Sequence, residues 1–488
     1  MSADSLDKAI AAILERSEPI DYEGLLRWPN PPSSSPAAAR IYKTFKLCKR
    51  IAAPPPDASQ DDPEEPQDIE EWLSQSEAQM VEMNVQLARM KAKMDEMKAE
   101  IQDMLAGNLE EKHSKNWIPS VDTHSLSSEP PITGRLDYSQ ADASEEEWLA
   151  AKEYLDKYRV PLRNLIRVED VADWRVFLKP RGYFQRASAL HTSLYSAVKL
   201  LCLAAVYHSL REREDDWDRY LLAAIRLTLS ASSIQLAMSH LVYCGGVAQV
   251  TRALEFVLGR SWPPTEALAQ LEAGLRSLDD EELLARTYVT ERVFMLEERR
   301  RKTKSGLRGS GWWRHMPGKR SAAFYLEQMT GLIRVANRPP NERTPAFLDA
   351  YKHVQSGKKF SSTRSSIETL IAPCAFANQL ALVRVRLARA ALAIRANESR
   401  DGDCPIPQEL LPRDPFDDAP VRHRQIDGGF MVYSVGWDGV DSGGSEDAMD
   451  KSWWPPGLAP IGRIAKDIVF KIALGAGKLP TLTGQSFP

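Results

Sequence analysis

Apolar residues recur at alternating spacings of three and four between residues 145 and 396 of this 488-residue chain. That spacing places them on one face of an α-helix, which a folded protein buries against other helices. Two clear cases are Leu194, Val198, Leu201 and Ala205, and Leu268, Leu271, Leu275 and Leu278. The sequence therefore predicts a mainly α protein with an antiparallel helical array, and no strict repeat assigns that array to a named solenoid.

Proline, glycine and acidic residues mark the expected helix boundaries in this region. Pro263-Pro264 is predicted to precede one helix, and Asp279 with Glu282 predicts a capping-box-like start for another. Gly245-Gly246 is predicted to separate two helices, because glycine weakens a helix interior. Three boundaries of the array are therefore expected at these positions.

A second periodic segment, residues 61–107, precedes the array. Its seam follows the heptad rule for a coiled-coil-like helix that ends at Gly107-Asn108. Methionine dominates the seam and specifies a partner poorly. Two interpretations stay open: homo-oligomerisation through residues 69–104, or an amphipathic helix packed on the chain's own array. The seam residues are Leu73, Ser76, Met80, Met83, Leu87, Met90, Met94, Met97, Ile101 and Met104.

The remaining segments complete a five-part organisation. Residues 1–60 form a helical and proline-rich N-terminal segment, residues 108–144 an irregular connector, and residues 397–488 a small α+β module. No segment has the features of a membrane span or a secretory signal. The five cysteines are scattered and contain no Cys-x-x-Cys pair, which argues against a zinc site and a disulfide framework.

The C-terminal module contains a hairpin signal followed by an acidic loop. Residues 421–426 and 430–435 alternate in type, and Asp427-Gly428-Gly429 separates them, which predicts a β-hairpin. The second strand leads into residues 438–444, a loop rich in aspartate and glycine. Carboxylates and tight glycine turns suit the oxygen ligation of a hard cation such as Ca²⁺. A polar β-turn that its aspartates merely cap is the alternative.

These motifs resemble the end of the globular domain of the major pseudopilin of type II secretion systems. That resemblance implies a calcium site with Asp438 and Asp467 as ligands and Asp441 as a further candidate. The chain departs from the pseudopilin pattern at residues 445–466, where a long insert replaces a short link. The motifs that carry the resemblance are Asp414-Pro415-Phe416, Tyr433-Ser434-Val435-Gly436, Asp438-Gly439, Gly443-Gly444 and Asp467-Ile468.

The order of helical array, Asp-Pro-Phe hairpin and Asp-Ile-Val-Phe ending is similar to that of a family of uncharacterised bacterial envelope proteins. Members begin with a basic segment and one membrane anchor, followed by a helix like residues 9–16 of this chain. The anchor is missing here. The resemblance implies the extracytoplasmic side of the cell envelope if the anchor has been trimmed, and otherwise a soluble relative.

A basic segment, residues 299–320, contains two tryptophans among its arginines and lysines. Such a segment suits contact with anionic lipid headgroups or with nucleic acid, but a solvated helix end and its loop explain the same residues and are the favoured interpretation. The formal net charge is -4 and the pI is about 6.2, so no strong binding to nucleic acid is expected. Weak contact with anionic membranes is the expectation.

Catalytic motifs are missing from the sequence, which contains no His-Glu-x-x-His, no phosphate loop and no Gly-x-Ser-x-Gly elbow. His191, His208 and His240 lie within helical patterns, where a structural histidine is expected. The leading hypothesis is a non-enzymatic scaffold or protein-interaction protein with a calcium-stabilised module. The alternatives are a hydrolase with a site in a cleft of the array, and a lipid-headgroup or nucleic-acid binder.

Overall fold

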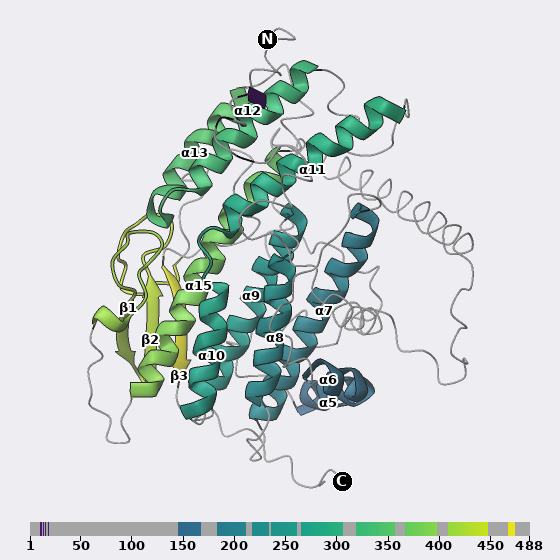
Figure 1. Cartoon of the computed structure of the whole chain (residues 1–488). Helices are drawn as coiled ribbons and strands as arrows, with labels where there is room; N and C mark the ends of the chain where they lie inside the picture. The colour runs from purple at the N-terminus through teal and green to yellow at the C-terminus, as the bar shows by residue number, and fades with distance from the viewer. Residues whose placement is uncertain are drawn as a thin grey trace, which may run out of the picture. The chain divides into compact units, whose positions relative to one another are not determined.

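The helical array predicted for residues 145–396 is present in the computed structural model (Figure 1). The described helices are α5 (Glu145–Lys157), α6 (Arg159–Ile166), α7 (Tyr183–Ser209), α8 (Trp217–Ser232), α9 (Ala237–Leu258), α10 (Thr265–Leu278), α11 (Leu283–Ser305), α12 (Lys319–Ala336), α13 (Pro340–Ser356), the π-helical turn η4 (Ile367–Ile371), α15 (Ala372–Asn397) and the 3₁₀ turn η5 (Gln408–Leu410). The structure describes residues 10, 11, 13, 15, 18, 145–166, 183–210, 217–233, 236–260, 265–305, 319–356, 367–397, 408–447 and 467–473.

Near the C-terminus the chain forms a three-stranded antiparallel sheet of β1 (Arg422–Ile426), β2 (Gly429–Ser434) and β3 (Ile468–Ala473), in the order β1-β2-β3. The predicted hairpin is confirmed, and Ile426 pairs with Gly429 across its turn. Gly428 supplies the positive φ of 72° that the turn needs. The third strand was not predicted. A mainly α fold with a small C-terminal β module is therefore confirmed, whereas the coiled-coil-like helix (61–107) and the connector (108–144) lie outside the described residues.

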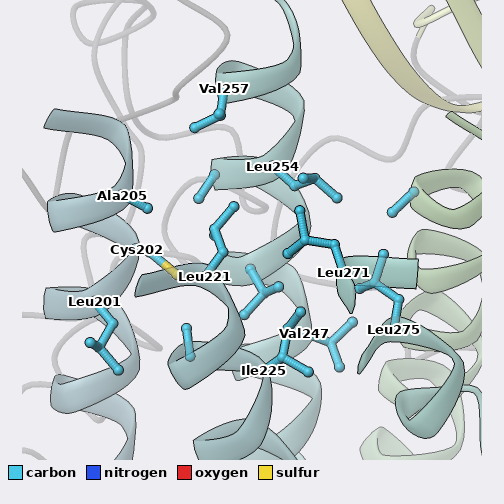
Figure 2. Close-up of a cluster of buried hydrophobic side chains, with 14 of the residues drawn as sticks. Leu201, Cys202, Ala205, Leu221, Ile225, Val247, Leu254, Val257, Leu271 and Leu275 are labelled. Carbon is cyan, nitrogen blue, oxygen red and sulfur yellow. The ribbon is translucent and has the colours of Figure 1, made fainter. Parts of the chain in front are cut away.

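The largest hydrophobic cluster lies between α7, α8, α9 and α10 (Figure 2). Every apolar residue that was predicted to line a helix face in α7 and α10 is buried. The buried face of α7 is wider than predicted, because Leu200, Cys202 and Leu203 are buried as well. Residues of this cluster include Leu201, Ala205, Leu221, Ile225, Val247, Leu254, Val257, Leu271 and Leu275.

The sheet shares this core with the helices. Phe430 and Val432 of β2 and Phe470 and Ile472 of β3 belong to the same cluster as the helical residues. Both strands contact α15, and β3 also contacts α9. A second cluster fills the space between α11, α12, α13 and η4. The sheet is therefore held against the array by buried apolar surface, which is the main favourable contribution to folding.

The prediction that Gly245-Gly246 separates two helices is wrong, because α9 runs without a break from Ala237 to Leu258. Gly246 faces α8 instead. A Cβ atom at this position would lie 2.7 Å from Thr228 Oγ1 and 2.9 Å from Thr228 Cγ2. The glycine therefore allows close packing of α9 on α8, and the helix tolerates it because its tertiary contacts outweigh the low helix propensity of glycine.

The two other predicted helix boundaries lie at or close to the observed helix starts. Helix α10 begins at Thr265, directly after Pro263-Pro264, as predicted. Helix α11 begins at Leu283, close to the predicted position, but its capping chemistry differs from the prediction. The amide of Glu282 donates to Oδ1 of Asp280 at 3.1 Å. Asp279, the predicted capping residue, instead pairs with two arginines of α15.

Helix α9 is the only described helix whose length and hydropathy would allow it to cross a membrane. However, 61% of its most apolar 18-residue window is buried inside the protein. Helices α7, α8 and α15 all pack against it. This is the environment of a core helix.

Candidate functional site

The Asp-Pro-Phe turn is held in place by the buried carboxylate of Asp414. Its Oδ1 accepts hydrogen bonds from Phe416 N at 3.0 Å and Ser434 Oγ at 2.9 Å. Its Oδ2 accepts from Val435 N at 3.0 Å and from the guanidinium of Arg422 at 3.1 Å. One carboxylate therefore ties the turn to the first and second strands of the sheet, which gives the motif a structural role.

The acidic loop after β2 is built from local turns. Asp438 Oδ1 accepts a hydrogen bond from Val440 N at 3.0 Å, and Asp441 Oδ1 accepts one from Gly443 N at 2.9 Å. Asp441 is exposed, and its Oδ2 lies 3.6 Å from Nε of Arg422. Aspartate commonly caps its own turn in this way. Both side chains are thus engaged with nearby backbone amides.

Asp467 closes this loop from a distant point in the sequence. Its side chain is fully buried, and its Oδ2 accepts hydrogen bonds from Gly444 N at 2.7 Å and Ser445 N at 3.0 Å. Ser442 N lies 3.4 Å from Oδ1. Gly444 has a φ of 78°, and this left-handed conformation favours glycine. Asp467 thus lies against the acidic loop and accepts hydrogen bonds from its backbone.

The groups around Asp467 differ from those a calcium ion needs. Backbone N–H groups point at its carboxylate, whereas Ca²⁺ is bound by six to eight oxygen atoms. Within the part of the chain that the structure describes, no three His, Cys, Asp or Glu side chains are placed to hold a metal. Hydrogen bonds close the loop as it stands. Calcium binding by Asp438, Asp441 and Asp467 stays a prediction.

A charged cluster lies where α15 meets the corner between α10 and α11. Arg386 Nε donates to Asp279 Oδ1 at 3.0 Å, and Arg386 also pairs with Glu281. Arg389 pairs with the other oxygen of Asp279 and with Glu272, the latter at 3.2 Å. Burial lowers the pKa of Arg386, but its pairing with the two acidic groups raises the pKa above its ordinary value.

A pocket of about 230 Å³ opens beside this cluster. Its lining combines Arg386 and Arg389 with Pro340 of α13 and residues of the Asp-Pro-Phe turn. Arg386 also donates to the carbonyl oxygen of Arg413 at 3.1 Å, which joins α15 to the C-terminal module. Both arginines are paired with carboxylates, so the pocket holds no unpaired cation on α15 for an anionic ligand. The cluster joins three parts of the fold.

Helix α9 contributes a serine to a buried serine–histidine pair. Nε2 of His191 on α7 lies 2.6 Å from Oγ of Ser239. Burial lowers the pKa of His191 to about 4, so the imidazole is neutral at pH 7. Activated nucleophiles use this kind of contact. However, Ser239 has no exposed surface, and a nucleophile must reach its substrate.

A second buried polar group surrounds the start of α9. Glu291 of α11 accepts a hydrogen bond from Ala237 N at 3.1 Å, and burial raises its pKa to about 7. His240 Nδ1 lies 3.5 Å from Thr287 Oγ1, and burial lowers the pKa of His240 to about 3. Sequence reasoning missed Glu291, because a single glutamate in a helix carries no signal. The sequence predicts a structural role for His240 and for His191, and both are buried.

The basic segment is only partly described. Residues 299–305 belong to the last turns of α11, and residues 306–318, with both tryptophans, lie outside the described residues. The expectation of membrane contact through this segment therefore stays a prediction. A scan against protein-family models found no matching family, and searches of curated proteins and of solved structures found no match.

Proposed function

We propose that this chain is a non-enzymatic scaffold or protein-interaction protein of the bacterial cell envelope. The observation that carries the proposal is the joining of the helical array and the C-terminal module through one shared core and one paired charge cluster. The array and the module would thus form one rigid unit whose surface a partner protein can bind. The envelope location rests on the resemblance of the C-terminal motifs and of the whole chain.

Polar and aromatic contacts reinforce the joint. Nε2 of Gln379, a buried residue of α15, donates to Pro340 O at 3.1 Å and to Pro415 O at 2.8 Å. One side chain therefore bridges the start of α13 and the Asp-Pro-Phe turn. The ring of Trp437 lies 4.9 Å from the ring of Phe416 and 5.5 Å from that of Phe376 on α15. Aromatic pairs at such distances add stability beyond the area they bury.

Other features of the proposal concern self-association and membranes. Residues 69–104 would join copies of the chain, and residues 299–320 would contact anionic headgroups weakly. Both segments supply the residue types for these roles in sequence. Calcium would add stability to the module without taking part in chemistry.

A hydrolase is the second candidate function, and the Ser239–His191 pair favours it. The 2.6 Å contact is within the range of a nucleophile and its general base. Catalysis at this pair would require an opening of the structure that exposes Ser239, since its side chain is buried. The two proposals therefore differ in whether the chain has a hydrolytic activity that depends on Ser239.

The test uses the full-length chain and the variant Ser239→Ala. Turnover of chromogenic carboxylic esters, phosphate esters and short peptides is measured for both proteins. The matched control is Ser230→Ala, since Ser230 is equally buried but its hydroxyl donates to Leu227 O of its own helix at 2.7 Å. The scaffold proposal expects no turnover by any of the three proteins. Turnover that Ser239→Ala abolishes and Ser230→Ala preserves would replace the scaffold by the hydrolase.

A further inference from the structure

Residues near the N-terminus pack into the second hydrophobic cluster, which lies between α11, α12, α13 and η4. Ile10, Ala11 and Ile13 are helical, and Glu15 N donates to Ala11 O at 2.9 Å. Ile10 and Ile13 are three positions apart, so they share one face of this turn. Ile13 is 1% exposed and belongs to the cluster, and Ile10 packs against it, whereas Glu15 is exposed. The short helix is therefore amphipathic, and its apolar face contacts the array.

An ion pair with a buried arginine follows this apolar contact. Oε2 of Glu18 lies 2.7 Å from the guanidinium of Arg292 on α11, and the side chain of Arg292 is 0% exposed. Removing a guanidinium from water is costly unless a carboxylate compensates its charge. Glu18 is itself 18% exposed, so its carboxylate lies between Arg292 and the solvent. The N-terminal segment thus supplies both apolar surface and a compensating charge to the array.

A long stretch of sequence, residues 19–144, connects this segment to α5. A connection of this length permits the segment to enter the site of its own chain or the identical site of a second copy. Exchange of an identical element between copies preserves every contact, which makes it a low-cost route to a dimer. Amphipathic helices with apolar anchors at positions i and i+3 commonly bind grooves of separate chains in this way.

We propose that Arg292 and the second hydrophobic cluster form a binding site for an amphipathic helix with two isoleucines three positions apart and a glutamate beyond them. The ligand is residues 10–18 of a second copy of this chain, whose Glu18 pairs with Arg292. The site is incomplete without such a segment, because Arg292 is buried and needs the carboxylate. The inference goes beyond the proposed scaffold function, which does not require it.

Charge reversal distinguishes exchange between copies from docking within one chain. The full-length variants Glu18→Arg and Arg292→Glu each bring like charges together, so each repels its own segment. When the two variants are mixed, exchange joins each altered partner to one of opposite charge. Each variant is prepared with a donor or an acceptor dye at its N-terminus. The matched control is Glu15→Arg, which makes the same charge change at an exposed position of the segment.

Energy transfer between Glu18→Arg and Arg292→Glu is expected to exceed that of Glu18→Arg mixed with itself. The thermal midpoint of the mixture should lie above those of both variants by several degrees, since the mixture restores the ion pair. Glu15→Arg mixed with Arg292→Glu should show neither effect. Equal energy transfer in the complementary mixture and in the self-mixture would overturn the second copy as the ligand.

A peptide tests the site without altering Arg292, which covers the case that Arg292→Glu does not fold. A fluorescent peptide of residues 5–22 is titrated into full-length Glu18→Arg, whose site is unchanged. It should bind this variant at least about tenfold more tightly than the parent, because a docked segment competes in the parent. The peptide with Ile13→Asp should not bind, since it would bury a charge. Equal binding to parent and variant, equal binding of both peptides, or no binding at millimolar concentration would overturn the site.

Discussion

Replacing Gly246 by alanine should destabilise the protein, although alanine is normally the better residue in a helix. The added methyl would lie 2.7 Å from Oγ1 and 2.9 Å from Cγ2 of Thr228. Thr228 is buried and β-branched, so it has little freedom to move aside. Helices α8 and α9 would have to separate, or the threonine would have to leave its rotamer.

A matched substitution isolates this packing effect. Gly331 lies inside α12, and a Cβ atom there would meet nothing within 4 Å. Gly331→Ala should therefore gain the helix propensity of alanine, about 1 kcal/mol. Gly246→Ala should gain the same and lose about 1–3 kcal/mol to overpacking. The difference between the two variants, about 1–3 kcal/mol, measures the close contact of α9 with α8.

Chemical denaturation followed by circular dichroism, with the thermal midpoint as a second measure, would give both values. The double variant Gly246→Ala with Thr228→Ala should recover part of the loss. A double-mutant cycle with these two sites should show a coupling of about 0.5–3 kcal/mol. If Gly246→Ala stabilises the protein as much as Gly331→Ala does, the glycine is not needed for helix packing and the reasoning is refuted.

Four further predictions concern other parts of the chain. Asp467→Ala should lower the free energy of unfolding by about 2–5 kcal/mol, since two amides lose their acceptor. Calcium at about 100 times its dissociation constant should stabilise the parent by about 2.7 kcal/mol but should not stabilise Asp438→Ala. Identical melting curves of the parent with calcium and with chelator would exclude the site. Burial raises the pKa of Glu291 to about 7, so its contribution to stability is complete below pH 4.5 and is lost as the pH rises towards 7. Urea titrations across this range should show that the parent loses on the order of 3 kcal/mol of unfolding free energy that Glu291→Gln does not lose. Parallel pH curves of parent and variant would contradict this prediction. If residues 69–104 join two copies, Leu87→Glu with Met94→Glu should separate them, and light scattering that reports a monomeric parent would refute the pairing.

Local patterns in the sequence predicted the elements well. The apolar spacing of α7 and α10 and the Asp-Gly turn of the hairpin depend on residues a few positions apart. The antiparallel pairing of β1 with β2 is local in the same sense, because a short turn joins the two strands. For this reason the fold class was predictable without any knowledge of the tertiary structure.

Contacts between distant residues were not predictable in this way. Asp279 was interpreted as a helix cap, but it pairs with Arg386, which follows 107 residues later. Gly246 was interpreted as a break, because sequence alone does not show that Thr228 lies against it. In the candidate site, the resemblance implied a calcium ligand at Asp467, which stays a prediction, and the amide groups that face this carboxylate became known only from the structure.

The contact between β3 and α9 has a consequence for how the chain is made. The amide of Lys471 in β3 donates a hydrogen bond to the carboxylate of Glu255 in α9. These two partners are separated by 216 residues, and a ribosome that adds 5–20 residues each second needs about 10–40 s to cover that distance. During this interval the face of α9 that later meets β3 lacks its partner. A newborn chain is therefore expected to need chaperone protection mostly in that interval, and release of the last strand from the ribosome ends it.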